Sequence, residues 1–284
     1  MSEENKMNAV KENALEFYNS IGWETEGEVT EDAKRWEDLR EHAKEYVSKC
    51  RLRVLRHIPT NGEYLLDMAS GPIQYKEYLE YSKNFKKRYC VDLSSEALET
   101  AEKKIGNHGV FLHGNFLSIP LEDNFFDCAI SLHTIYHINH DLQEAAVRKL
   151  VAVTKPGKPI IIVYSNPDTL SLTAPYRFVR NIAAYLYRLP GKMISRLKNG
   201  KQNKEIPFNL YIHPHPNKWW LTFSDVADVK ILPWRSFSTD MQKSLFPDNR
   251  LGKKMLAILF KLEDSYPNFF AKYFQYPMII LTKK

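Results

Sequence analysis

The sequence predicts an α/β fold in which helices cover both faces of a mostly parallel seven-stranded sheet. Short apolar segments alternate with segments of helical periodicity along most of the chain, the pattern typical of a parallel sheet. Residues 159–164 are apolar throughout, as expected of a central strand buried on both faces. Two other apolar segments, 64–66 and 88–91, each end at an acidic residue.

The N-terminal part is expected to be helical. In 6–20 the apolar residues share one face, and Gly22 is expected to end this helix. A long helix is expected over 31–57, because apolar residues recur there at helical spacing. Pro59 would stop it.

The remaining elements follow in order. We expect strands at 64–66, 88–91, 110–113, 125–131, 159–164, 226–232 and 276–282. We expect helices at 74–81, 94–104, 141–152, 218–223, 240–245 and 251–263. Residues 166–217 carry no early strand pattern and are rich in arginine and lysine. This arrangement predicts an N-terminal helical cover over 1–60, a core over 61–165, an inserted helical lid over 166–222 after the fifth strand, and a C-terminal part over 223–284 that completes the sheet.

The segment after the first strand is the most informative one. Asp67 is followed by Ala69, Ser70 and Gly71, which predicts a tight turn. A glycine in such a turn allows a ligand to approach the backbone, and an acid beside it can accept hydrogen bonds from the ligand. Asp92 ends the second strand, the position from which nucleotide-binding sheets bind ribose hydroxyls.

Five motifs in a fixed order resemble those of class I S-adenosylmethionine-dependent methyltransferases, most closely the ubiquinone/menaquinone-type branch. They are the turn 67–73, Asp92, and segments 114–116, 126–131 and 154–157. The resemblance implies a Rossmann-like sheet, an N-terminal cover and a terminal antiparallel hairpin. It also implies S-adenosylmethionine as the cofactor, S-adenosylhomocysteine as its product, and no metal.

The same resemblance implies roles for single residues. Asp92 would bind the ribose hydroxyls and Asn115 the adenine edge, with Phe116 stacked near it. Asp67 would lie near the methionine amino group. The whole expected cofactor set is Asp67, Ala69, Ser70, Gly71, Asp92, Leu93, Asn115, Phe116 and Leu132.

Three positions depart from the family pattern. Ala69 and Ile73 stand where the first and third glycines are usual, and Asn115 stands where aspartate is common. A dinucleotide site needs all three glycines to approach a pyrophosphate, so the departures argue against NAD or FAD. S-adenosylmethionine has no phosphate and tolerates such a turn.

Two histidines follow the fourth strand, at the sheet edge where ligands collect. His133 and His137 are four residues apart, so a helical turn would place both on one face. A neutral imidazole can take a proton from an incoming hydroxyl or amine. By resemblance to phosphobase methyltransferases, Tyr18 and His137 would close over the reacting methyl group. The alternatives are a packed histidine that caps a helix, and an enzyme that acts by positioning alone.

The acceptor pocket is expected to include Trp23, Tyr136, His213 and Trp219. Imidazole and indole rings before the sixth strand can line such a pocket, and they can equally form the core of the C-terminal part. The spacing of His133 and His137 also suits a metal pair, but no third ligand stands near them, so we expect no metal.

Composition narrows the classes of function. The three cysteines show no paired spacing, and the polar start of the chain is unlike a secretory signal, so we expect a cytoplasmic protein. The net charge of +6 is compatible with an acidic substrate, a membrane surface or nucleic acid.

The sequence thus favours methyl transfer to oxygen or nitrogen of a small molecule. One alternative is C-methylation of a quinone or other lipid, with peripheral membrane contact through the basic lid. Another is a nucleic-acid-binding protein or RNA methyltransferase, which the absence of a nucleic-acid-base motif after the fourth strand disfavours. A third is a scaffold that has lost catalysis.

Overall fold

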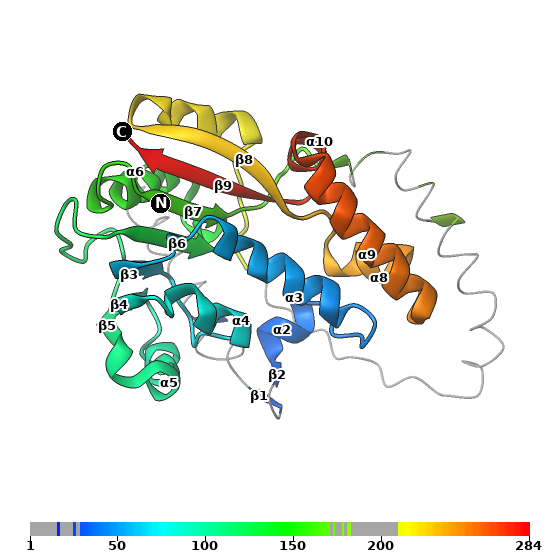
Figure 1. Ribbon diagram of the computed structural model, residues 1–284, viewed down its shortest axis with the longest axis horizontal. Helices are drawn as coiled ribbons and strands as arrows, with labels where there is room; N and C mark the ends of the chain where they lie inside the picture. Colours follow the sequence, from blue (N-terminus) through cyan, green and yellow to red (C-terminus); the bar gives the residue numbers. More distant parts are fainter. Residues whose placement is uncertain are drawn as a thin grey trace, which may run out of the picture.

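The computed structural model describes residues 16–17, 25–26, 29–170, 173, 178, 181–182 and 210–284. A seven-stranded sheet forms its centre, in the order β5-β4-β3-β6-β7-β9-β8 (Figure 1). The strands are β3 (Gly62–Met68), β4 (Phe85–Asp92), β5 (Gly109–His113), β6 (Cys128–Leu132), β7 (Pro159–Val163), β8 (Ala227–Arg235) and β9 (Tyr276–Lys283). All seven expected strands are present, and the predicted α/β class is confirmed.

The five strands β3 to β7 are parallel, and β9 lies antiparallel between β7 and β8. The expected terminal hairpin is therefore confirmed. Because β8 is antiparallel to β9, it runs in the same direction as the parallel strands. The end of β8 and the start of β9 consequently reach the edge at which the parallel strands end, which is where the site lies.

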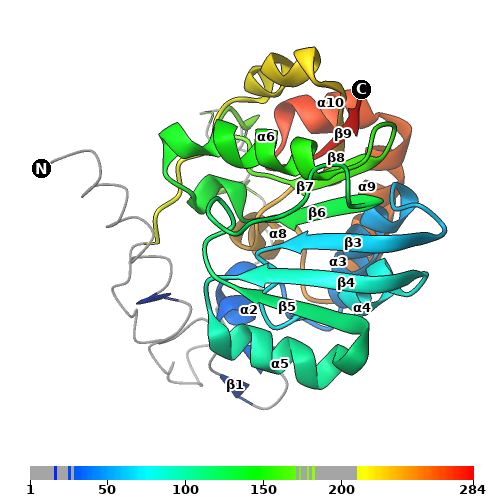
Figure 2. The same ribbon diagram turned by 90° about the vertical axis from the view of Figure 1, so that its left-hand side faces the viewer.

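Helices pack on both faces of the sheet (Figure 2). They are α2 (Glu31–Trp36), α3 (Lys44–Leu52), α4 (Lys76–Leu79), α5 (Ser95–Ile105), α6 (Gln143–Val153), α8 (Thr239–Leu245), α9 (Arg250–Ser265) and α10 (Pro267–Tyr273). One buried core joins α6 and the 3-10 helix η8 (Asn217–Asp225) to the sheet, and a second joins α3, α9 and α10 to the other face. A smaller cluster lies beneath α5.

A buried polar network ties α3, α9 and β8 together. Arg53 Nη1 donates to Glu263 Oε2 at 2.7 Å, and the other carboxylate oxygen of Glu263 accepts from the hydroxyls of Tyr46 and Ser236. Glu263 is fully buried. Such a charge is tolerated in a core only when its oxygens are hydrogen-bonded, and both oxygens are bonded here.

The single long helix predicted over 31–57 is wrong. The structure contains α2, an interruption, α3 and a 3-10 turn at Arg53–Arg56. The carboxylate of Asp38 accepts from the backbone N–H of Arg40 at 3.3 Å and from its guanidinium at 2.7 Å and 2.8 Å. This local bonding competes with helical backbone bonds and turns the chain. The apolar periodicity continued through the break and concealed it.

Smaller differences concern the ends of the chain. The helix α10 and the two-residue strands β1 (Thr25–Glu26) and β2 (Val29–Thr30) were not predicted, and 217–225 is a 3-10 helix. Most of the helix expected over 6–20 lies outside the described residues, as do nearly all the basic residues of the expected lid.

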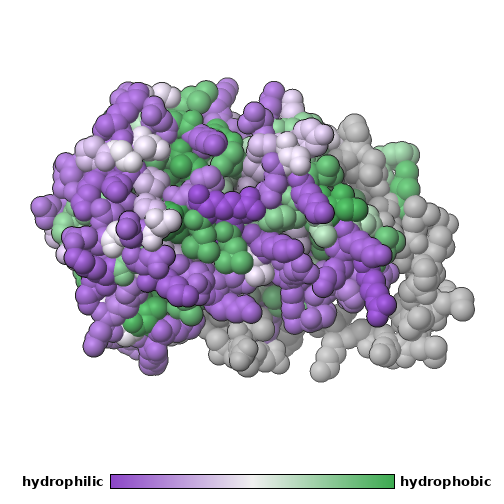
Figure 3. Space-filling view, in the orientation of Figure 1, coloured by the Kyte–Doolittle hydropathy of each residue, from purple (hydrophilic) through white to green (hydrophobic). Residues whose placement is uncertain are grey.

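The face of the molecule seen in Figure 3 is largely polar. Figure 3 shows mostly hydrophilic residues on the face in view, with small hydrophobic areas between them. None of the helices in the described part of the chain has the length and apolar character needed to cross a bilayer.

Candidate cofactor and acceptor site

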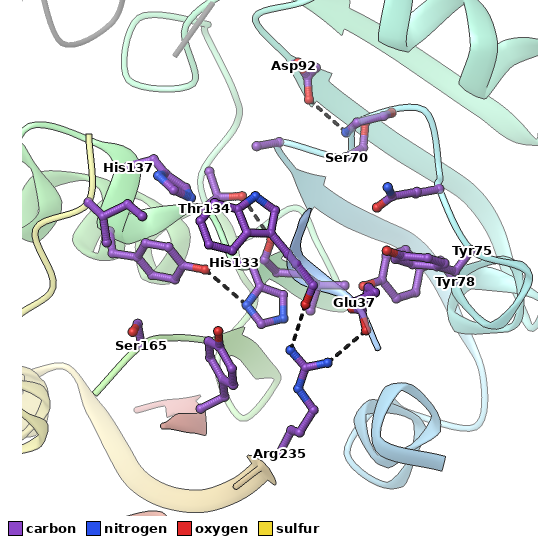
Figure 4. A pocket seen from close by; sticks show the side chains of 18 of the residues that line it. Glu37, Ser70, Tyr75, Tyr78, Asp92, His133, Thr134, His137, Ser165 and Arg235 are labelled. Carbon is purple, nitrogen blue, oxygen red and sulfur yellow. Dashed lines mark hydrogen bonds and ion pairs between the residues drawn. The ribbon is translucent and has the colours of Figure 1, made fainter. Parts of the chain in front are cut away.

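A cavity of about 490 Å³ opens at the carboxyl ends of β3, β4 and β6. Its walls come from both halves of the chain (Figure 4). The residues that line it include Trp36, Glu37, Asp67, Ala69, Ser70, Gly71, Tyr75, Tyr78, Asp92, Leu93, Leu132, His133, Tyr136, His137, Arg235 and Tyr276. Its volume is within the range of small-molecule sites.

The turn after β3 has a left-handed backbone at three alternate positions. The φ angles of Ala69, Gly71 and Ile73 are 55°, 54° and 49°. These are the positions at which the resembled family has its glycines, so this chain makes the same turn with two non-glycine residues. A β-branched residue such as Ile73 rarely adopts this backbone, and the conformation is strained. The side chain of Ile73 is buried beside Cys90 and Leu98, and this packing offsets part of the strain.

Asp92 joins this turn to the end of β4. Gly71 N–H donates to Asp92 Oδ2 at 2.8 Å, and Ser94 N–H donates to Oδ1 at 2.9 Å. Burial raises the pKa of Asp92, and these backbone donors oppose that rise. Each carboxylate oxygen has a second lone pair that can accept from a ribose hydroxyl.

Asp67 has a partner on the neighbouring strand. Arg88 Nε donates to Asp67 Oδ2 at 3.0 Å, and Arg88 Nη2 contacts the same oxygen. In the β3–β4 register Leu65 is opposite Arg88 and Asp67 opposite Cys90, so the two charged side chains share a face of the sheet. Burial raises the pKa of Asp67, and the charge of Arg88 partly offsets this. Asp67 still lines the cavity, where it can accept from an amino group.

His137 is fixed in one tautomer. Its Nδ1 lies 2.8 Å from the carbonyl oxygen of Tyr211. Because a carbonyl only accepts, Nδ1 must carry the proton, and Nε2 is then the basic nitrogen. Burial lowers the pKa of His137 to about 4, so the ring is neutral near pH 7.

His133 also lines this cavity. Its φ is 60°, a left-handed conformation that is uncommon for histidine. Its ring packs edge-on against Trp234 and Tyr276, and Nδ1 lies 3.2 Å from Tyr136 Oη. Burial and then the charge of Arg235 lower the pKa of His133, which keeps this ring neutral too. The helical turn expected over both histidines begins only at Ile135, yet both side chains line the cavity.

The far wall comes from residues that sequence reasoning missed. Trp36 ends α2 and Glu37 follows it, while Arg235 ends β8 and Tyr276 begins β9. Arg235 Nη1 donates to Glu37 Oε2 at 2.8 Å. No motif marks these residues, because strand pairing and helix docking alone bring them together. For Arg235, the available signal was its place at the end of a strand parallel to β7.

The structure brings together ten of the predicted site residues. The cavity is lined by Asp67, Ala69, Ser70, Gly71, Asp92, Leu93, Leu132, His133, Tyr136 and His137. Tyr18 and Trp23 lie outside the described residues.

Four other predicted residues do not line this cavity. Asn115 Oδ1 accepts from Leu117 N–H, and Phe116 is buried in the core beneath Lys149. The backbone N–H of His213 donates to Tyr136 O at 3.0 Å, which joins the segment around His213 to the segment around Tyr136. Trp219 stacks on His215 and packs against the core that contains η8. For Trp219 this arrangement favours the core alternative, whereas His213 is exposed.

The chemistry of the cavity fits a nucleoside with a methionine tail. The turn offers backbone approach at Gly71, and two carboxylates stand at adjacent strand ends. Within the described residues, no three histidine, cysteine or carboxylate side chains group as metal ligands do.

Comparison with known proteins agrees with this geometry. Residues 66–162 match the family model described as a methyltransferase domain. No curated protein matches the chain. Magnesium protoporphyrin IX methyltransferase from Synechocystis, solved with bound S-adenosylhomocysteine, is similar with a TM-score of 0.52 and 14% identity, over 97% of this chain and 100% of that one. A SAM-dependent methyltransferase from Archaeoglobus fulgidus is similar with a TM-score of 0.50 and 16% identity, over 84% of this chain and 94% of that one. At these identities the likeness is one of fold.

Proposed function

We propose that this chain, a class I S-adenosylmethionine-dependent methyltransferase, transfers the methyl group to oxygen or nitrogen of a small molecule. One observation supports the proposal most strongly. The turn 67–73, here called the cofactor turn, and two neutral imidazoles, His133 and His137, line the same cavity. Neutral histidines beside an electrophilic methyl group suit an acceptor that loses a proton as it is methylated.

The cofactor supplies an electrophilic methyl group, and the residues of this chain hold it. Asp92 would accept hydrogen bonds from the ribose hydroxyls. It would do so through the carboxylate lone pairs that do not already accept from Gly71 N–H and Ser94 N–H. Asp67 would face the methionine amino group, with its own charge balanced by Arg88. The positive-φ turn would bring its backbone against the ligand.

His137 would act at the acceptor. Since Tyr211 holds its Nδ1 proton, Nε2 can accept the proton of an attacking hydroxyl or amine. A methylated oxygen that still bears its proton is strongly acidic, so an imidazole of low pKa suffices to remove it from a hydroxyl acceptor. Tyr18 stays a predicted partner from the N-terminal part. We further propose that 1–60 and 166–222 cover the core 61–165, and that 223–284 completes it.

The direct test uses S-adenosylmethionine with a ¹³C-labelled methyl group and a panel of hydroxyl, amine and activated-carbon acceptors. The ¹³C shift of the product distinguishes methyl on oxygen, nitrogen and carbon. We expect O- or N-methyl products, with release of S-adenosylhomocysteine. A product methylated only on carbon would support the quinone or lipid alternative instead.

A further inference from the structure

The far wall of the cavity carries a buried guanidinium. Arg235 is only 2% exposed, and Figure 4 shows its guanidinium turned toward Glu37 and the space beneath His133. Its polar contacts include a 2.8 Å bond to Glu37 Oε2, a longer 3.4 Å contact to the carbonyl of Trp36 and a hydrogen bond with the Tyr276 side chain. Its Nε has no hydrogen-bond partner among the described residues. A guanidinium has five N–H donors, so these contacts do not saturate it. An arginine held inside a ligand cavity is well suited to bind a planar oxyanion.

Glu37 competes with a ligand for the donors of Arg235 less strongly than its 2.8 Å bond to Arg235 suggests. Its carboxylate also lies 3.5 Å from Arg51 Nη2, which in turn lies beside Glu77. When a ligand oxyanion takes up donors of Arg235, Arg51 remains in contact with Glu37. The cluster of two arginines and two glutamates can therefore accommodate an added oxyanion without leaving Glu37 unpaired.

Aromatic rings form much of the wall around this arginine. Tyr75 and Tyr78 lie edge to face, with centroids 5.2 Å apart, and Trp36 also lines the cavity. The guanidinium carbon of Arg235 is 5.0 Å from the ring centroid of Tyr276. Rings of this kind favour a flat aromatic ligand through stacked and edge-on contacts.

We propose that the methyl acceptor is an aromatic compound bearing an acidic oxygen, with its ring between these walls and its oxyanion on Arg235. This inference rests on the proposed function and names its acceptor class. The acidic group is an aromatic carboxylate or a phenolate, two groups with the same oxyanion chemistry. Arg235 binds and orients the acceptor, and His137 stands at the reacting atom.

The test is calorimetry on the full chain saturated with S-adenosylhomocysteine. The probes are benzoate and 4-nitrophenolate, with benzamide as the neutral aromatic control and cyclohexanecarboxylate as the non-aromatic acid. We expect benzoate or 4-nitrophenolate to bind at least tenfold more tightly than both controls. The tighter of the two identifies the source of the oxyanion. Equal binding of benzamide would overturn the proposal.

Two substitutions should act in opposite directions. Arg235→Gln should weaken the binding of the aromatic anion at least tenfold. Glu37→Gln should strengthen its binding about fivefold, because this substitution removes a competing carboxylate. Unchanged affinity in Arg235→Gln, or weaker binding in Glu37→Gln, would contradict the inference. The double variant Glu37→Gln/Arg235→Gln keeps the cluster neutral and guards against a folding defect in the single variants. It should bind the anion as weakly as Arg235→Gln.

Affinity for S-adenosylhomocysteine distinguishes a failure of the proposed function from a failure of the inference on the acceptor. It should stay within twofold of wild type in all three variants, because Arg235 and Glu37 lie beyond the cofactor turn. If wild type fails to bind S-adenosylhomocysteine, the proposed function fails and this inference with it. If S-adenosylhomocysteine binds but the probes do not behave as stated, only the inference on the acceptor fails.

Discussion

The backbone N–H of Gly71 donates to Asp92 Oδ2 at 2.8 Å and so joins the turn after β3 to the end of β4. Ser94 N–H holds the other oxygen at 2.9 Å. Asp92 therefore orders the turn through its own carboxylate. The residue expected to bind the ribose is also the residue that shapes the turn around the methionine end.

Replacing Asp92 with asparagine should destabilise the fold as well as the site. The amide NH₂ of asparagine would face one of two backbone N–H donors and leave it unpaired, at a cost of about 1–3 kcal/mol. Urea unfolding checks this, with Asp123→Asn on an exposed loop as the control. Equal stability of the two variants would show that Asp92 does not order the turn.

The strain at Ala69 predicts that glycine is the better residue there. A left-handed backbone costs a non-glycine residue about 1–2 kcal/mol. The greater freedom of glycine in the unfolded chain costs about 0.4–1 kcal/mol. Ala69→Gly should therefore raise the free energy of unfolding by about 0.5–1 kcal/mol. Ala101→Gly, inside α5, should lower it by at least about 1 kcal/mol. The prediction fails if both variants lose stability alike.

Arg88 should be essential to stability because Asp67 is buried. Arg88→Met leaves that carboxylate without its partner and should cost about 3–5 kcal/mol. Lys86→Met, at the exposed start of the same strand, should cost less than about 1 kcal/mol. In a denaturant series, Asp67→Leu/Arg88→Met should recover much of the loss, because both charges are then removed. A loss in Arg88→Met no larger than in Lys86→Met would rule out an essential ion pair.

His137 predicts a loss of stability in acid. Its pKa falls from 6.5 to about 4 on folding, so below pH 6.5 the unfolded chain binds the proton first. Stability is then full above about pH 6.5 and decreases as the pH falls toward 4, by up to about 3 kcal/mol from this residue. Urea unfolding at pH 7.5, 6.5, 5.5 and 4.5 should show a shallower decline in His137→Gln than in wild type. His113→Gln, on the surface, should keep the wild-type slope, and an unchanged slope in His137→Gln would contradict the burial argument.

Turnover tests the role proposed for His137 and Tyr18. Removing a proton acceptor should lower kcat by about 10²-fold or more, so we expect this of His137→Ala, with affinity for S-adenosylhomocysteine retained. Tyr18→Phe should lower kcat to a smaller extent. The hypothesis of a histidine–tyrosine pair fails if both variants keep full turnover on the identified acceptor.

The sequence predicted the sheet well because strand patterns and strand-end acids are local signals. All seven strands, the terminal hairpin and the turn at 67–73 follow from short segments. The break after Trp36 did not, because side-chain bonds of Asp38 override a periodicity that continues on both sides. Helix α10 was missed because only one residue separates it from α9.

The site residues at or just after predicted strand ends could be predicted from the sequence. Those that only tertiary packing brings together could not. Asp67, Asp92 and the two histidines each end or follow a strand, and all line the cavity. Glu37 and Arg235 are 198 residues apart in the sequence, and only tertiary contacts join them. Phe116 belongs to a motif that predicted a cofactor contact, but its ring is buried in the core.

Calorimetric binding of S-adenosylhomocysteine to wild type, Asp92→Ala and Glu99→Gln tests whether Asp92 holds the cofactor. Glu99 is an exposed acid on α5 and serves as the matched control. We predict saturable binding with one site in wild type and Glu99→Gln, and at least a tenfold loss in Asp92→Ala. No heat of binding in folded wild type, or equal affinity in Asp92→Ala, would contradict a cofactor site built on the strand-end acids.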